Sequence, residues 1–367
     1  MNDQLTEVYA SIDALIDYAL AHLDLDPRNA DWTRNQIFAL FRLDSYPGPK
    51  TTTSAASVSD VVQDIVGSRS QAPYGEKTPD PLLAAFRAAA TTAGLFKPEE
   101  GPAYADTIMG ILSANPADLD DRFLLVEHRD GGMAAMQWFY DYCVANNYVK
   151  RAQLDRNPRF DSHGLTVTIN LAKPEFKNMK KAAAGNAVAG GYPKCTICHE
   201  NEGFAGRDKR TLRTLPVTLG GESWFWQFSP YGYFDQHGIC VNTDHTPMHV
   251  DRDTFGHLLD FVDRFPGYFL GCNAALPRIG GSVLAHDHYQ GGGELLPMHK
   301  AATWAAFTLA DYPDAVVEIL DWPGTAVRVL RSTQRLPAQL PPMRTGARPD
   351  TRSAAHLPAR WACPAPS

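Results

Sequence analysis

The sequence predicts an α+β protein in which a mainly helical N-terminal region precedes a region of strands. Apolar residues recur at helical spacing over residues 5–23, 32–43 and 81–95, which indicates that residues 1–160 are mainly helical. The pattern then changes, because residues 165–171 (LTVTINL) alternate between apolar and polar side chains as a half-buried strand does.

Further elements are expected in chain order. Residues 60–66 fit a short helix, Gly131-Gly132 marks a break, and the Ala- and Gly-rich stretch 182–191 fits a flexible loop. Residues 251–265 fit an amphipathic helix that carries four apolar residues on one side, Phe255, Leu258, Leu259 and Val262. Strands are expected at 211–219, 222–228, 238–242, 268–272 and 283–290, and a strand pair within 315–330 is expected to turn at Pro323-Gly324.

The composition excludes several classes of protein. A net charge of -7 argues against broad nucleic-acid binding. No apolar run approaches the ~18 residues that a membrane helix needs. The first 20 residues lack the basic start and continuous apolar segment of a signal peptide. We therefore expect a cytoplasmic protein that binds neither nucleic acid nor membranes.

The last 36 residues, 332–367, differ from the rest of the chain. They contain seven Pro, seven Ala and five Arg, and Asp350 is their single acid. Such a segment buries too little apolar surface to offset the entropy of ordering it. We expect it to be disordered. Out-of-frame translation is the favoured interpretation, and a natural disordered tail is the alternative.

The six cysteines are too few for a disulfide scaffold in a chain of 367 residues. Cys195 and Cys198 form a CxxC pair, which in a reducing compartment indicates a metal site or a redox site. A zinc ion usually takes four ligands, so histidines would have to complete a metal site. The candidates are His199, His237, His245, His249 and His286.

A second group of polar residues lies in the sequence HDHYQ. If this segment is a strand, His286, His288 and Gln290 project to the same side, about 7 Å apart at each step. Glycines precede and follow the segment, and glycines allow backbone N–H groups to approach a phosphate closely. The pattern therefore indicates a site that handles phosphate.

Three stretches together carry a resemblance to a known family: 195–207 (CTICHENEGFAGR), 228–250 (FSPYGYFDQHGICVNTDHTPMHV) and 267–292 (GYFLGCNAALPRIGGSVLAHDHYQGG). They resemble class II galactose-1-phosphate uridylyltransferases of the histidine-triad superfamily, and the resemblance extends from residue 1 to about 331. It implies an antiparallel sheet with packed helices. Residues 161–250 would form the first half-domain and 251–331 an incomplete second half-domain, because family members continue beyond this chain.

The resemblance also implies the chemistry. His288 would attack the α-phosphorus of UDP-glucose, and galactose 1-phosphate would then take the uridylyl group to give UDP-galactose. Gln290 would hydrogen-bond the transferring phosphoryl group. A structural zinc would be held by Cys195, Cys198, His245 and His286. Substrate contacts would come from Asn201, Arg207, Asn273 and Ser282. No organic cofactor is implied, and a homodimer is the expected assembly.

Two alternatives stay open. One is a histidine-triad nucleotidyl hydrolase or phosphorylase, against which Gln290 and the long helical N-terminal region argue. The other is an inactive truncated fragment that still binds zinc or a nucleotide.

Overall fold

A computed structural model describes residues 3–48, 78–171, 191–276 and 283–331 of the chain. The segments expected at 60–66, 182–191 and 332–367 lie outside the described residues. The chain divides into two compact units, residues 1–295 and residues 296–367, and each is described by itself below. The expected domain boundaries near residues 160 and 250 stay predictions.

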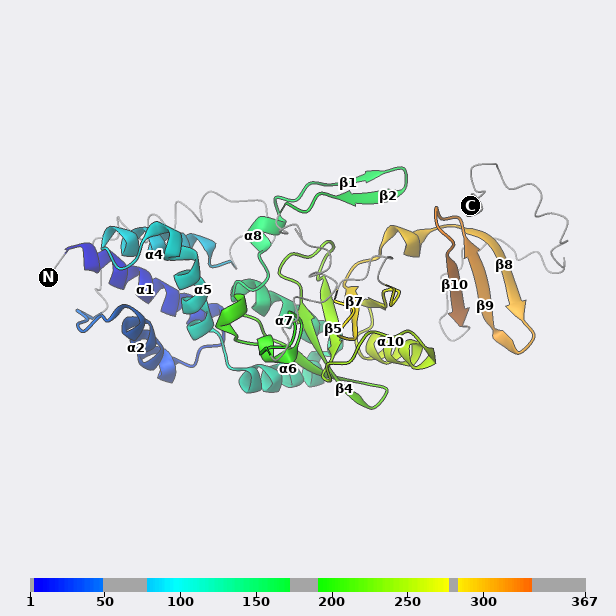
Figure 1. Cartoon of the computed structure of the whole chain (residues 1–367), viewed down its shortest axis with the longest axis horizontal. Helices are drawn as coiled ribbons and strands as arrows, with labels where there is room; N and C mark the ends of the chain where they lie inside the picture. The colour runs from blue at the N-terminus through cyan, green and yellow to red at the C-terminus, as the bar shows by residue number, and fades with distance from the viewer. Residues whose placement is uncertain (1–2, 49–77, 172–190, 277–282, 332–367) are drawn as a thin grey trace. The chain divides into compact units, whose positions relative to one another are not determined.

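Helices form the N-terminal part of the first unit (Figure 1). The three helices predicted from periodicity are confirmed as α1 (Asp3–His22), α2 (Ala30–Phe41) and α4 (Asp80–Thr92). The chain continues through α5 (Gly101–Leu112), α6 (Pro116–Asp130), α7 (Gly132–Ala145) and the short α8 (Arg151–Leu154). Gly131, with a φ of 89°, separates α6 from α7 at the predicted break.

A five-stranded antiparallel sheet follows, with the order β3-β4-β5-β7-β6. Its strands are β3 (Leu215–Leu219), β4 (Glu222–Phe228), β5 (Gly238–Asn242), β6 (Phe269–Gly271) and β7 (His288–Gly292). Strand β7, which carries most of the HDHYQ segment, therefore lies inside the sheet and pairs on both sides. The architecture is α+β, as predicted.

The two faces of this sheet differ because successive side chains of a strand point to opposite sides. Trp226, Cys240 and Tyr289 occupy matched positions on β4, β5 and β7 and belong to the buried core. That core also contains residues of the helices, including Phe139 of α7, so helices and sheet share one interior. His288 and Gln290 alternate with Tyr289 and therefore point to the opposite face.

Helix α10 (Arg252–Arg264) covers the core face of the sheet, where Phe261 packs 5.1 Å from the ring of Trp226. Asp251 caps its N-terminus by accepting from the N–H groups of Asp253 and Thr254. The helix was predicted, and two residues of its expected apolar side, Leu258 and Val262, pack against the core, but the other two do not. Phe255 and Leu259 are 63% and 61% exposed, because the sheet contacts the side that carries His257 and Phe261.

Several strand boundaries also differ from the prediction, among them the start of β9 at Tyr312 and the end of β2 at Thr168. Strand β7 begins at His288 rather than at 283, because Val283 has a φ of 59° and its carbonyl accepts from the N–H of His286 in a turn. Strand β3 begins at Leu215 rather than at 211. His286 consequently lies on a turn and not within the strand.

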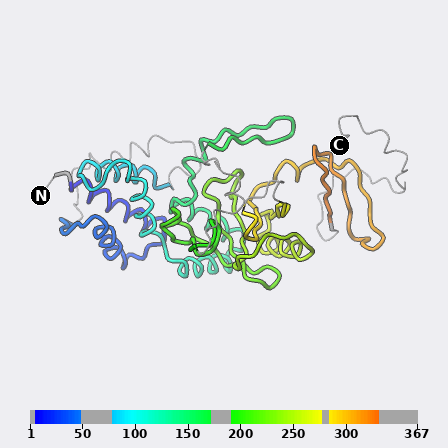
Figure 2. Tube along the Cα trace, in the orientation of Figure 1, coloured from blue at the N-terminus to red at the C-terminus, as the bar shows by residue number. Residues whose placement is uncertain are grey.

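Strands β1 (Arg159–Ser162) and β2 (Leu165–Thr168) form a hairpin that projects from the first unit (Figure 2). Its side chains are mostly exposed. Arg159 pairs with Glu294, and the side chain of Asn170 donates to the carbonyl of Tyr231, so the base of the hairpin is attached to the unit.

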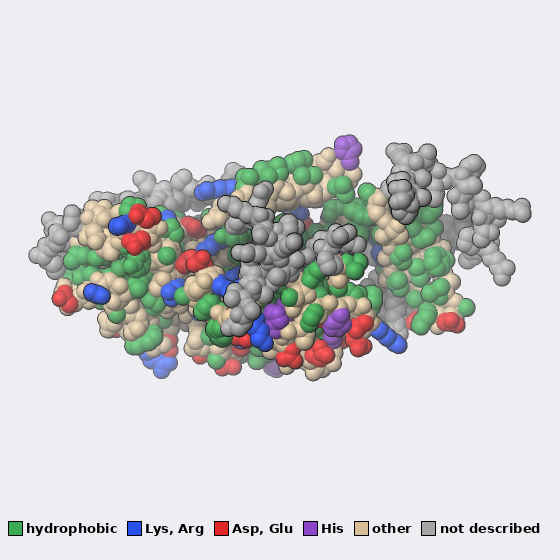
Figure 3. Space-filling view, in the orientation of Figure 1, with side chains coloured by type: hydrophobic (Ala, Val, Ile, Leu, Met, Phe, Trp, Pro, Cys, Tyr) green, Lys and Arg blue, Asp and Glu red, His purple; other side chains and the backbone are tan. Residues whose placement is uncertain are grey.

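The second unit contains an antiparallel sheet with the order β10-β9-β8. Its strands are β8 (Thr303–Leu309), β9 (Tyr312–Leu320) and β10 (Val327–Arg331), and the predicted turn at Pro323-Gly324 joins β9 to β10. Six apolar residues share one face of this sheet, and hydrophobic residues dominate its visible surface (Figure 3). These residues are Ala305, Phe307, Val317, Ile319, Val327 and Val329.

Among the described helices of the whole chain, none is long and apolar enough to cross a membrane.

The packing of α7 against the end of α10 can be tested with one added methyl group. A Cβ at Gly132 would collide with the backbone oxygen of Arg264, and Gly132→Ala is expected to lower the free energy of unfolding by about 1–3 kcal/mol. The control is Gly256→Ala within α10, where nothing lies within 4 Å of the added Cβ and stability should rise by roughly 0.5–1 kcal/mol. Urea denaturation measures both, and equal stability of Gly132→Ala and the parent chain would contradict the packing.

Candidate functional site

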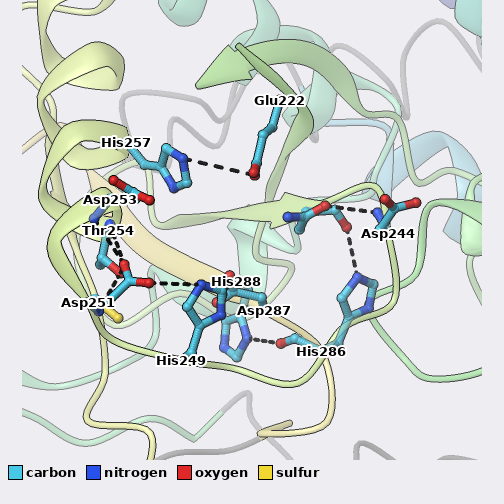
Figure 4. A network of polar contacts seen from close by, with 12 residues as sticks. Glu222, Asp244, His249, Asp251, Asp253, Thr254, His257, His286, Asp287 and His288 are labelled. Atoms are coloured by element: carbon cyan, nitrogen blue, oxygen red, sulfur yellow. Dashed lines mark hydrogen bonds and ion pairs between the residues drawn. The ribbon is translucent and has the colours of Figure 1, made fainter. Parts of the chain in front are cut away.

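The polar residues of interest gather at the start of β7 and on the turn before it (Figure 4). His286 on the turn and His288 at the start of the strand are both buried. Segments that are far apart in sequence are attached to this turn. The N–H of Asp287 donates to the carbonyl of Thr246 at 2.7 Å, and the N–H of Met248 donates to the carbonyl of Leu284 at 2.9 Å.

Four side chains converge as a group that could hold a metal ion: Cys195, Cys198, His245 and His286. Their ligand atoms all lie within 4.8 Å of one another. The Sγ atom of Cys195 is 3.3 Å from Nδ1 of His286, and the Sγ atom of Cys198 is 3.1 Å from Nδ1 of His245. In a tetrahedral zinc site with Zn–S bonds of about 2.3 Å, neighbouring ligand atoms lie roughly 3.5 Å apart. The donor set and the spacing therefore fit such a metal.

The CxxC loop is shaped by its own hydrogen bonds. The N–H of Cys195 donates to Sγ of Cys198 at 3.2 Å. Asn201 is fully buried, and its Nδ2 donates to the carbonyls of both cysteines at 2.8 Å. The hydrogen bond between the thiols lowers the pKa of Cys195 to about 7, with help from the backbone N–H of Ile197. A thiolate, the form that binds metals, is thus accessible near neutral pH.

The orientation of His286 is fixed by a carbonyl group. Its Nε2 donates to the backbone oxygen of Asn242 at 2.8 Å, which leaves Nδ1 without a proton and directed at the two sulfur atoms. Metal-binding histidines are usually oriented by a hydrogen bond of this kind.

His288 has the features of a nucleophile. Its Nδ1–H donates to the carbonyl of His286 at 2.8 Å, so the lone pair of the neutral ring is on Nε2 (Figure 4). Burial lowers the pKa of His288, which favours the neutral ring. Gln290 lies two residues further on the same face of the sheet, and its Oε1 is 3.2 Å from Nε2 of His237.

Asp287 was not selected from the sequence, although an acid between two histidines is an unusual signal. Its carboxylate is fully buried, and neither oxygen has a hydrogen-bond partner in the part of the chain that the structure describes. Burial raises the pKa of Asp287. Nδ1 of His249 lies 3.6 Å from this carboxylate, and Nε2 of His249 lies 3.6 Å from Asp251 at the start of α10 (Figure 4).

The glycines after the motif are explained by packing. A Cβ at Gly291 would collide with the backbone oxygen of Phe269, and one at Gly292 would collide with the ring of Phe234. The packing of the sheet therefore requires glycine at both positions, whether or not a phosphate approaches them.

The expected substrate-binding residues are placed differently from one another. Nδ2 of Asn201 bonds the CxxC loop, while its buried Oδ1 has no partner among the described residues. Nη2 of Arg207 donates to the carbonyl of Pro193 at 2.9 Å. Nδ2 of Asn273 is buried and has no partner among the described residues. Ser282 lies outside the described residues. The four substrate contacts stay predictions.

The remaining metal-ligand candidates lie outside the group of four. His199 is 3.5 Å from Glu202, His237 contacts Gln290, and His249 lies between two carboxylates. Of the five histidines that the sequence left open, His245 and His286 are the two that lie within reach of the cysteine sulfur atoms.

Asn201 provides a test of the CxxC loop. Asn201→Ala removes both hydrogen bonds to the loop carbonyls and is expected to lower the free energy of unfolding by about 1–3 kcal/mol. Asn35→Ala, at an exposed position of α2, is the matched control and should leave it within about 0.5 kcal/mol. Urea denaturation compares the two, and an unchanged Asn201→Ala protein would show that the loop does not depend on this amide.

Residues 68–247 match the family described as galactose-1-phosphate uridyl transferase, N-terminal domain. No solved structure matches the chain.

Curated relatives cover most of the chain. A galactose-1-phosphate uridylyltransferase of Bifidobacterium longum subsp. longum is 98% identical over 335 residues, which are 91% of this chain and 65% of the relative. Relatives of the same name from Halalkalibacterium halodurans and Butyrivibrio fibrisolvens are each 33% identical; the matches cover 88% and 87% of this chain and 62% and 79% of the relatives. The chain thus spans less than two thirds of the length of the first two relatives. The chain belongs to the galactose-1-phosphate uridylyltransferase family.

Proposed function

We propose that this chain carries the uridylyl-transfer site for the exchange between UDP-glucose and galactose 1-phosphate. The observation that supports it most is His288, a buried imidazole whose Nδ1–H is held by the His286 carbonyl and whose Nε2 lone pair is therefore available. Such a histidine can act as a nucleophile toward phosphorus without first losing a proton.

In the first half-reaction, Nε2 of His288 attacks the α-phosphorus of UDP-glucose. An N–P bond forms while the bond from the α-phosphorus to the bridging oxygen breaks, and glucose 1-phosphate leaves with that electron pair. The ring becomes positively charged, and the carbonyl of His286 stabilises it through the Nδ1–H hydrogen bond.

In the second half-reaction, a phosphate oxygen of galactose 1-phosphate attacks the same phosphorus. The N–P bond breaks, its electrons return to Nε2, and UDP-galactose is released. Gln290 offers an amide donor to the phosphoryl oxygens but cannot act as a general acid. This favours an intermediate that waits for a sugar phosphate over one that is hydrolysed.

We propose that Cys195, Cys198, His245 and His286 hold zinc, since two sulfur and two nitrogen donors in a closed group suit this ion. A bound zinc would supply structural cross-linking between the CxxC loop and the turn before β7. Because His286 also orients His288 through its carbonyl, the metal group and the nucleophile share one support.

We also propose a cytoplasmic location, which would keep the two thiols reduced. A homodimer is the expected assembly, and analytical ultracentrifugation of the purified chain tests it.

Uridylylation of His288 is the direct test of the proposed chemistry. Incubation with UDP-glucose labelled in the uracil ring should leave base-stable, acid-labile label on the protein. His288→Asn should abolish the label, because an amide provides no nucleophilic nitrogen. His163→Asn, on the exposed hairpin, is the matched control and should label normally.

Two results would count against this proposal. Equal labelling of His288→Asn would show that the nucleophile is elsewhere. Release of free UMP that galactose 1-phosphate does not divert into UDP-galactose would favour the hydrolase alternative.

Metal analysis tests the zinc proposal. The purified chain should contain about one zinc ion per molecule, and Cys195→Ser should lose the metal and unfold at a lower temperature, since structural zinc contributes to folding. Cys272→Ser, a half-buried cysteine outside the group, should keep the metal. The site would be ruled out if the purified chain contained no metal and Cys195→Ser had the same melting temperature as the parent chain.

A further inference from the structure

We propose that His237 is a positioning residue that orients the side-chain amide of Gln290 so that its NH₂ group, and not its oxygen, faces the transferring phosphoryl group. The effect on phosphoryl transfer rests on the proposed function, but the orientation of the Gln290 amide can be tested in the protein without substrate.

His237 is held at the end of the connection between β4 and β5. Its side chain is buried, and its carbonyl accepts from the N–H of Ser229 at 2.8 Å. The ring of Phe234 packs 4.4 Å from the imidazole. Gly232 allows the connection to fold over this residue, because a Cβ there would lie 2.8 Å from Cβ of His237. The imidazole is therefore fixed before any substrate binds.

The protonation of this ring follows from its partners. The backbone N–H of Tyr233 donates to Nδ1 of His237 at 3.4 Å, and a backbone N–H can only donate. Nδ1 must then carry the lone pair, so the proton of the neutral ring is on Nε2. That Nε2–H points at Oε1 of Gln290, 3.2 Å away.

The orientation of the amide follows in turn. Gln290 has an oxygen at one end of its amide and a nitrogen at the other, and the oxygen is occupied by His237. A rotated amide would direct its NH₂ group at the Nε2–H of His237, so two donors would face each other. The described part of the chain offers the NH₂ group no hydrogen-bond partner of its own, so it is available to a ligand.

The chemistry at His288 requires a donor at this position. Negative charge on the phosphoryl oxygens is stabilised by N–H groups and repelled by the oxygen of an amide. Gln290 and His288 project from the same face of β7, about 7 Å apart along the strand, so the amide can reach a phosphorus bound to Nε2. His237 contributes by excluding the wrong orientation of Gln290.

Single-turnover labelling by UDP-glucose tests the consequence. His237→Phe should slow uridylylation of His288 by roughly tenfold to a hundredfold while the half-saturating UDP-glucose concentration changes by less than about threefold. His237→Gln, which can place an amide N–H near the former Nε2, should restore most of the rate. In a Gln290→Ala background, His237→Phe should have no further effect, because the two residues act as one unit. His163→Phe is the surface control.

Nitrogen-15 NMR of the imidazole tests the orientation without any turnover. At neutral pH, His237 should be the Nε2–H tautomer, and His237→Phe should shift the side-chain amide signals of Gln290. An Nδ1–H tautomer, a charged ring, or fully additive rate effects in the double variant would overturn the inference. A chain that never becomes labelled would overturn the proposed function. The tautomer of His237 would still test the orientation of the Gln290 amide.

Discussion

The position of His286 is the constraint on which the rest of the site depends. Its side chain directs Nδ1 at the two cysteine sulfurs because its Nε2 is bound to the carbonyl of Asn242. Its own carbonyl accepts the Nδ1–H of His288. One residue therefore joins the four side chains that could hold a metal ion to the candidate nucleophile, and a shift of this turn would disturb both. This explains why the four-residue group and His288 lie so close together.

The sheet holds this turn in place by separating its two faces. On one face, Trp226 and Tyr289 are buried against helices in a core that extends to α1. On the other face, His288 and Gln290 are left for chemistry, and Nε2 of Gln227 donates to the carbonyl of Ile197 in the CxxC loop.

Much of the fold could be predicted because its signals are local. The helical spacing of 5–23 and the length of 222–228 depend on neighbouring residues alone, and both elements were confirmed. The buried side of α10 could be predicted only in part, since its contacts come from a sheet elsewhere in the chain and override the apolar pattern of Phe255 and Leu259. The turn at 283–287 was missed for a related reason: it depends on backbone hydrogen bonds to the distant segment 243–250, which bend the chain there.

For the site, the sequence is sufficient to identify the chemical types that are present: a CxxC pair, and His288 alternating with Gln290 in a glycine-rich setting. Local spacing is sufficient for these, because residues two or three apart have nearly fixed distances. The approach of His245 and His286 to the cysteines, and the contact of His237 with Gln290, come from the tertiary fold. Such pairs are separated by about 50 to 90 residues. Their approach depends on strand pairing and on the shared core, and no local pattern records either.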